Sequence, residues 1–249
     1  MKGGKRMSAD KILGRVHSIE TFGSLDGPGI RYVIFLQGCP LRCVYCHNPD
    51  TWDKNSNLLM SSDEIIKDIV KYKNFISSGG VTISGGEPLI QAQFCLEIIN
   101  LCHDHNIKCA IDTSGAIILS ECKDVIDAAD LILLDIKALD PELCKKITRF
   151  TNEHALKILD YCEKTKKDVW IRHVLVPTLT LDEQKLEELA NFVSQFSCIK
   201  KVELLPFHKL GEYKWKAMGL KSICEDIPEP TCEEIEFANN IFRSKNIPL

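Results

Sequence analysis

The alternation of apolar runs with helix-like segments is the feature that most restricts the fold of this chain. Runs of strand length recur six times, and segments with a helical spacing of apolar residues lie between them. Parallel strands need a long crossover connection, usually a helix, so this alternation predicts an α/β fold with a parallel sheet. The six predicted strands are residues 32–36, 81–84, 108–111, 131–136, 169–176 and 201–205.

The predicted helices carry local signals of their own. Residues 61–64 read Ser-Ser-Asp-Glu, the spacing of a capping box at a helix N-terminus. The apolar face of this helix is formed by Ile65, Ile66, Ile69 and Val70. A short strand is expected at residues 14–20, before a turn at residues 26–29. Periodicity alone leaves both an open doubly wound sheet and a barrel as candidates. The other predicted helices are residues 89–103, 117–128, 153–165, 181–196 and 231–243.

Length and charge restrict the class of protein. A chain of 249 residues with 45% hydrophobic residues suits one large domain, so we expect a flexible leader at residues 1–13 and a single domain at residues 14–249. A net charge of -4 disfavours nucleic acid and anionic lipid as partners. No apolar run approaches the roughly 20 residues that span a bilayer, and residues 1–7 lack the apolar stretch of a secretory signal. We therefore expect a cytoplasmic protein.

Three of the twelve cysteines form one group, while the others are scattered in a way that favours reduced thiols. Cys39, Cys43 and Cys46 follow the first of the six predicted strands at spacings of three and two residues. Structural zinc sites need four protein ligands, and all-protein iron-sulfur clusters need four thiolates. His47 is poorly placed as a fourth ligand because it adjoins Cys46. The loop therefore predicts a 4Fe-4S cluster with one iron open to a substrate. The alternatives are a zinc knuckle or incidental buried thiols.

Polar and glycine-rich motifs follow the later strands. Residues 84–88 read Ser-Gly-Gly-Glu-Pro, where the absence of β-carbons lets a ligand approach the backbone, although an ordinary strand-to-helix turn has the same composition. Asp135 and Lys137 are two apart on a strand, so they share a face and together suit a carboxylate ligand. The alternative for this pair is a surface ion pair. His208 follows the last strand, where a packed core histidine is the alternative to a functional one.

The cysteine loop resembles the hallmark of the radical S-adenosylmethionine enzymes, in which an aromatic residue, here Tyr45, precedes the last cysteine. The resemblance implies a partial (β/α)6 TIM-like barrel with its chemistry at the C-terminal mouth of the strands. Residues 14–53 resemble more closely the activases of glycyl-radical enzymes, in the pyruvate formate-lyase branch. Other activases often insert a cysteine-rich segment after the cluster loop, whereas the 38 residues between Cys46 and Gly85 contain no cysteine.

The resemblance implies an oxidoreductase that cleaves S-adenosylmethionine reductively and forms a glycyl radical on its partner. It also implies a role for individual residues, each located here in this chain. The resemblance implies that the cluster is ligated by Cys39, Cys43 and Cys46, and that the methionine amino group is held by Gly85, Gly86 and Asp112. The methionine carboxylate is expected to bind Lys137, and the ribose Asp135 and His208. The adenine is expected to contact Tyr45, His47 and Val174, and Arg172 is expected to position the cofactor or the substrate loop. The resemblance also implies a monovalent cation, Na+ or K+, with Asp112, Thr113, Asp135 and the Leu133 carbonyl as its expected ligands.

The resemblance also implies partners. The protein substrate is pyruvate formate-lyase, Asp26 meets its target loop unless it is only a turn residue, and the activase acts as a monomer. The electron donor is flavodoxin or ferredoxin. Residues 200–221 hold six lysines against two glutamates, which fits an acidic donor or simply a solvated face. Two other functions remain open: activation of another glycyl-radical lyase or of anaerobic ribonucleotide reductase, and a zinc-binding interaction module.

Overall fold

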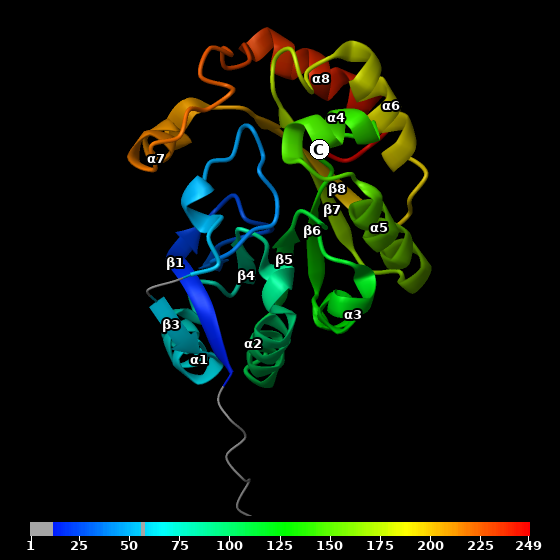
Figure 1. Ribbon diagram of the computed structural model, residues 1–249. Coiled ribbons are helices and arrows are strands. Elements are labelled where there is room, and N and C mark those ends of the chain that lie inside the picture. Colours follow the sequence, from blue (N-terminus) through cyan, green and yellow to red (C-terminus); the bar gives the residue numbers. More distant parts are fainter. Residues whose placement is uncertain (1–11, 56–57) are drawn as a thin grey trace, which may run out of the picture.

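The computed structural model describes residues 12–55 and 58–249, and the strands in this part form one open mixed sheet (Figure 1). The strand order is β3-β1-β2-β4-β5-β6-β7-β8. From β2 to β8 the pairing is parallel, and these six strands confirm the six that the sequence predicts. The strands are β1 (Leu13–Gly23), β2 (Arg31–Leu36), β3 (Leu58–Ser61), β4 (Gly80–Gly85), β5 (Cys109–Thr113), β6 (Leu131–Asp135), β7 (Val169–Leu175) and β8 (Ile199–Pro206).

Helices cover the outer face of the parallel strands, where α1 packs on α2, α2 on α3 and α3 on α5 (Figure 1). The capping box of α1 is present as predicted, with Ser61 accepting from the Glu64 amide. Val70 departs from its predicted place on the apolar face, because the helix tightens there into a 3-10 turn and leaves the side chain exposed. The helices are α1 (Ser62–Ile69), α2 (Ala92–Asp104), α3 (Leu119–Ala128), α4 (Pro141–Thr148), α5 (Glu153–Thr165), α6 (Glu183–Val193), α7 (Glu212–Ala217) and α8 (Cys232–Ser244).

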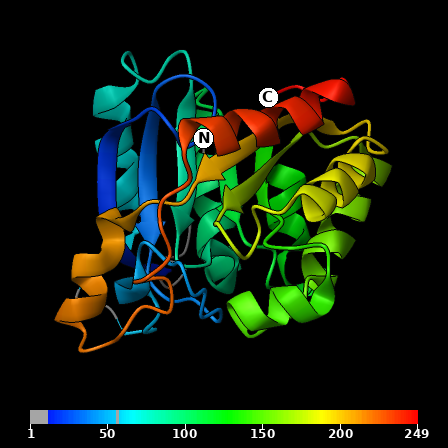
Figure 2. The same cartoon turned by 90° about the horizontal axis from the view of Figure 1, so that it is seen from above.

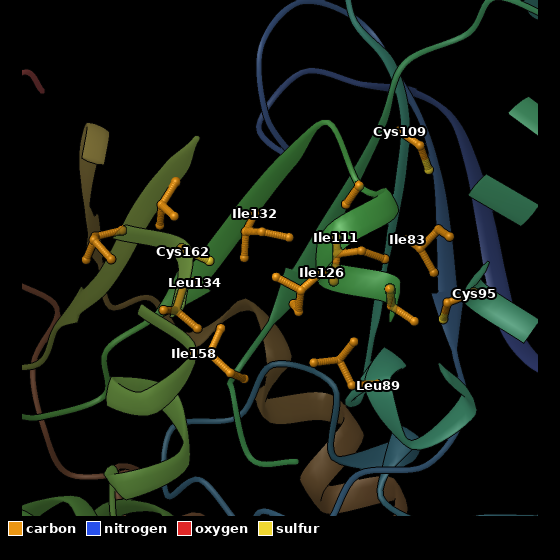
Figure 3. Close-up of a cluster of buried hydrophobic side chains, with 14 of the residues drawn as sticks. Ile83, Leu89, Cys95, Cys109, Ile111, Ile126, Ile132, Leu134, Ile158 and Cys162 are labelled. Atoms are coloured by element: carbon orange, nitrogen blue, oxygen red, sulfur yellow. The ribbon is translucent and has the colours of Figure 1, made fainter. Parts of the chain in front are cut away.

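The main core fills the space between the sheet and the helices. Figure 3 shows Ile83, Ile111 and Ile132 of three neighbouring strands facing Ile126 of α3 and Ile158 of α5. Because side chains alternate along a strand, the residues between them point to the concave face of the sheet. That face carries a small apolar cluster at the level of Ala110 and Leu133, and polar residues nearer the strand ends.

The sheet remains open, so the structure is a partial barrel of the predicted kind. β3 is one edge, and β8 is the other, where the Val202 amide donates to the Pro248 carbonyl. Helix α8 packs on α6 and β8 and is the red helix in Figure 2. β1 begins at Leu13, and the rest of the predicted leader, apart from Ile12, lies outside the described residues. No described helix is long and apolar enough to cross a membrane.

Candidate functional site

A cavity of about 700 Å³ lies at the carboxyl ends of the parallel strands, where the concave face of the sheet meets the cysteine loop. The carboxyl edge of such a sheet is where ligands bind in barrels of this type. The cavity mixes apolar surface with charges of both signs. Its charged lining residues are Asp26, Asp112, Asp135, Lys137, Arg172, Lys201 and Glu203.

The cysteine loop lines this cavity with Cys39, Cys43 and Cys46. The Val44 amide donates to the Ile147 carbonyl at 3.0 Å, so α4 braces the loop from the outside. Cys39 and Cys43 are buried, Cys46 is half-buried, and all three are free thiols. Burial raises the pKa of Cys39 to about 12 and raises the pKa of Cys43 further, although the Lys137 ammonium opposes the shift of Cys43. A positive metal centre is therefore needed to hold these sulfurs as thiolates.

Gly85 and Gly86 bring the end of β4 against the start of the cysteine loop. A β-carbon on Gly86 would lie 2.4 Å from the Gly38 carbonyl oxygen and 3.0 Å from the β-carbon of Cys39. Gly85 has a φ of +125° and would place a β-carbon 2.2 Å from the Leu36 amide nitrogen. Only glycine fits both the conformation and the contact.

The carboxylate of Asp112 is held between two strands. It accepts from the Ser84 hydroxyl at 2.7 Å and pairs with Arg172 at 3.1 Å. The Arg172 Nε also lies 3.4 Å from a Glu203 carboxylate oxygen. Attraction to Asp112, opposed by burial, raises the pKa of Arg172, so this side chain is a permanent cation in the cavity. Asp26 lies at the same cavity, and burial together with the Asp112 charge raises the pKa of its carboxyl group.

Asp135 and Lys137 point to the same side, as their spacing predicts, and form an ion pair of 2.6 Å. Both side chains are less than one-fifth exposed, which rules out the alternative of a solvated surface pair. Burial, the largest single influence, favours a neutral lysine, but the Asp135 carboxylate together with Tyr45 and Cys43 outweighs it and raises the pKa of Lys137 well above its ordinary value. The pair therefore offers a fixed ammonium and a fixed carboxylate to a ligand.

Two histidines from distant parts of the chain lie in contact in the cavity lining, with their rings tilted by 49°. The rings of His47 and His208 lie 3.8 Å apart between centroids, and the His47 Nε2 lies 2.8 Å from the His208 carbonyl oxygen. Burial lowers the pKa of His47, which favours a neutral ring at neutral pH. Val174 completes this side of the cavity. One residue predicted for the adenine, His47, therefore contacts one predicted for the ribose, His208.

The radical SAM superfamily model matches residues 33–193. Curated relatives named pyruvate formate-lyase-activating enzyme are 41% identical in Listeria monocytogenes serovar 1/2a, over 95% of this chain and 98% of the relative, and 43% identical in Clostridium pasteurianum, over 87% and 91%. The pyruvate formate-lyase 1-activating enzyme of Escherichia coli K12 is 36% identical over 93% and 96%. The chain belongs to the radical SAM superfamily, in the family of pyruvate formate-lyase-activating enzymes.

Solved structures agree with the fold of this radical SAM protein. A domain of pyruvate-formate lyase-activating enzyme from Bacteroides vulgatus ATCC 8482 superposes with a TM-score of 0.58 at 23% identity, over 68% of this chain and 96% of that one. Streptococcus suis SuiB bound to precursor peptide SuiA superposes with a TM-score of 0.68 at 16% identity, over 93% and 48%. At these identities the likeness concerns the fold alone.

The radical SAM superfamily implies a 4Fe-4S cluster and S-adenosylmethionine, and the residues of the cavity fit both. Among the buried polar atoms of its lining, Tyr45 Oη and His208 Nδ1 have neither a hydrogen-bond partner nor an ion-pair partner within residues 12–55 and 58–249. Leaving such atoms unsatisfied is costly, so they point to a polar ligand. In the described part of the chain no three His, Cys, Asp or Glu side chains lie close enough together to hold a single metal ion. A 4Fe-4S cluster does not require this, because each cysteine binds a different iron.

The cavity gathers most of the residues predicted for the site. Thr113 and Leu133, predicted for the cation, are instead buried beside the cavity. The Thr113 hydroxyl donates to Glu87 at 2.7 Å and accepts from the Gly115 amide. The predicted site residues that line the cavity are Asp26, Cys39, Cys43, Tyr45, Cys46, His47, Gly85, Gly86, Asp112, Asp135, Lys137, Arg172, Val174 and His208.

Sequence reasoning missed two acids. Glu87 is fully buried and accepts from residues 113 and 114 of β5 and the segment after it, so it joins the glycine motif to the neighbouring strand. A carboxylate inside an otherwise apolar strand-to-helix turn was the available signal. Glu203 lies two residues after Lys201 on β8, and its alternation toward the concave face was the signal there.

The lysines of residues 200–221 do not form the continuous basic surface that their number suggests. Lys201 lines the cavity and lies 4.9 Å from the ring centroid of Trp170. Lys214 is only 17% exposed and pairs with Asp50 at 3.0 Å. Lys209 and Lys221 each pair with a neighbouring glutamate. The tertiary structure therefore spreads and neutralises much of this charge.

Proposed function

We propose that this chain activates pyruvate formate-lyase by forming a radical on a backbone glycine of that enzyme. The observation that carries the proposal is one cavity that joins three clustered thiols to a fixed ammonium, a fixed guanidinium and unsatisfied polar atoms. Relatives at 41% and 43% identity, of which the alignment covers 98% and 91%, are named pyruvate formate-lyase-activating enzyme. When bound, the cluster supplies the electron that cleaves S-adenosylmethionine to methionine and a 5'-deoxyadenosyl radical.

The residues of the chain then bind and aim the cofactor. Cys39, Cys43 and Cys46 would ligate the cluster. The ammonium of Lys137, held in place by the Asp135 carboxylate, would bind the methionine carboxylate. Gly85 and Gly86 would offer backbone to the amino group, which Asp112 would balance electrostatically. Asp135 and His208 would bind the ribose, and Tyr45, His47 and Val174 would enclose the adenine. No general base is required of the protein.

A monovalent cation would lie beside Asp112 and Asp135, whose negative charges favour it. Thr113 and the Leu133 carbonyl would complete its ligands from the buried side. Asp26 and Arg172 both line the cavity, and Arg172 is tied to the segment of Asp26, because its Nη2 donates to the Leu25 carbonyl at 3.3 Å. This pair would position the glycine-bearing loop of the lyase.

The proposed setting follows from the same chemistry. A flavodoxin or ferredoxin would supply the electron, and the activase would work as a cytoplasmic monomer. The free basic surface near the cysteine loop is smaller than the sequence suggests, and Lys216 is its exposed member. Charge reversal at Lys216 would lower the rate of reduction by an acidic donor and weaken its salt dependence.

The test is anaerobic reconstitution with iron and sulfide, followed by electron paramagnetic resonance for a glycyl radical on purified pyruvate formate-lyase. Cys43→Ala should fold, lose the brown chromophore and form no radical. Cys232→Ala is the matched control, because Cys232 is exposed on α8 and away from the loop. Wild-type cofactor cleavage by Cys43→Ala would refute the cluster assignment.

A second candidate is activation of a different glycyl-radical enzyme, either another lyase or anaerobic ribonucleotide reductase. The cavity lining would suit the cofactor equally in that case. The same radical assay against a panel of purified partners decides between them. A radical on another partner and none on pyruvate formate-lyase would reverse the order of the two candidates.

A further inference from the structure

The backbone of the third cysteine is held from the far end of the chain. The Trp215 indole, on α7, donates from Nε1 to the Cys46 carbonyl oxygen at 2.8 Å. Trp215 is buried, and it lies beyond the residues that the superfamily model matches. A buried indole N–H needs an acceptor, so this contact is specific to one carbonyl of the loop.

The first cysteine is held through its backbone carbonyl as well, here by a cation. Arg42 donates from Nη1 to the carbonyl oxygens of Cys39 at 2.8 Å and Leu41 at 2.7 Å. The Arg42 amide donates to the Thr148 carbonyl at the end of α4, which anchors this residue to the barrel. The guanidinium therefore cannot swing away without breaking several bonds.

Trp52 joins the two donors. The Trp52 and Trp215 rings meet edge to face with 5.1 Å between centroids, and the Arg42 guanidinium lies 5.0 Å from the Trp52 centroid. Both geometries are favourable for an aromatic ring. We propose that Arg42, Trp52 and Trp215 form a clamp that fixes the distance between Cys39 and Cys46 and so positions the cluster.

Neighbouring contacts keep α7 in place against the loop. Lys214 donates to the Asn48 side-chain oxygen at 2.7 Å and pairs with Asp50, which in turn lies 3.0 Å from His17 of β1. Gly211 packs so closely on His47 that a β-carbon would lie 2.8 Å from its backbone. The clamp thus rests on a segment that is tied to the loop at several points.

The experiment uses Trp215→Phe, which keeps an aromatic ring and removes only the N–H donor, and Arg42→Lys, which leaves Trp215 intact. Tyr213→Phe is the control, since Tyr213 is the exposed neighbour on the same helix. The readouts are the rate of iron release to a chelator and the midpoint potential of the reconstituted cluster. Neither involves the lyase, so they can fail separately from the proposed function.

We expect Trp215→Phe to release iron roughly fivefold faster, the factor that corresponds to one net hydrogen bond. Its midpoint potential should become more negative, because a donor next to a cluster ligand is lost. Arg42→Lys should do the same, and Tyr213→Phe should match the wild type. Control-like release and potential in both variants would overturn the clamp. Faster release at an unchanged potential would also overturn it, since a purely structural role has that effect. If Trp215→Phe cannot be loaded, Arg42→Lys decides by the same readouts.

Discussion

Replacing the buried Glu87 by glutamine should weaken the whole domain. One carboxylate oxygen accepts from the Thr113 hydroxyl at 2.7 Å and the Leu89 amide at 3.0 Å, and the other accepts from the Ser114 amide at 3.0 Å and the Ser114 hydroxyl. Burial raises the pKa of Glu87, and these hydrogen bonds oppose it. Four donors on two oxygens leave no room for a proton, so the geometry favours the ionised form.

Glu87→Gln turns one of these oxygens into an NH2 group, which faces two donors in either orientation. The loss of two charge-assisted bonds and the stranding of their donors should lower the free energy of unfolding by about 2–4 kcal/mol. For a chain of this size that corresponds to a fall in Tm of roughly 5–15 °C. The assay is anaerobic thermal and urea unfolding of the cluster-free protein. Glu121→Gln, exposed on α3, is the control. A loss below about 0.5 kcal/mol would refute the four-bond assignment.

Three further predictions concern the cavity and the sheet. Gly86→Ala should prevent stable cluster loading, measured by iron content, because its β-carbon meets the Gly38 carbonyl at 2.4 Å, and a wild-type iron content would contradict this prediction. Lys137→Met should weaken S-adenosylmethionine binding to the reconstituted protein roughly tenfold to a hundredfold by equilibrium dialysis, the value of one charge-assisted bond; unchanged affinity would exclude its carboxylate role. Burial lowers the pKa of His173, so below about pH 6.5 the unfolded state binds a proton that the native state resists. The free energy of unfolding should therefore decrease as the pH is lowered through this range. His173→Gln should flatten this slope between pH 5 and 7 in urea unfolding, and an equal slope would contradict the prediction.

The elements that sequence analysis missed share a dependence on distant partners. β3 is four residues long and exists because it pairs with β1, since Leu58 and Leu59 are exposed and carry no local periodicity. Helix α4 begins at a proline after its Asp140 cap and has only eight residues. Its apolar residues Cys144 and Ile147 are buried against the cysteine loop, a contact that its own short sequence does not indicate. α7 has six residues, too few for a periodic signal.

The surface lysines illustrate the same dependence. Counting charges along residues 200–221 ignores that Lys201 lines the cavity, while Lys200, at an irregularity in the pairing of β8 with β7, stays exposed. It also ignores Asp50, which lies far away in the chain and pairs with Lys214. Charge density along a sequence therefore does not measure charge density on a surface.

Local chemistry determined what the sequence alone could establish here. The spacings of the three cysteines, the glycine motif and the two-residue spacing of Asp135 and Lys137 are fixed by covalent neighbours, and the alternation of strand and helix is set by the period of apolar residues. Contacts between segments distant in the chain were decided only by the tertiary structure. Glu87 accepts hydrogen bonds from β5 and from the residue after it, and Trp215 donates to the Cys46 carbonyl, because the fold brings these distant segments together. Hydrogen bonds and packing act over a few ångströms in space, and no pattern along one segment records which other segment will be that near.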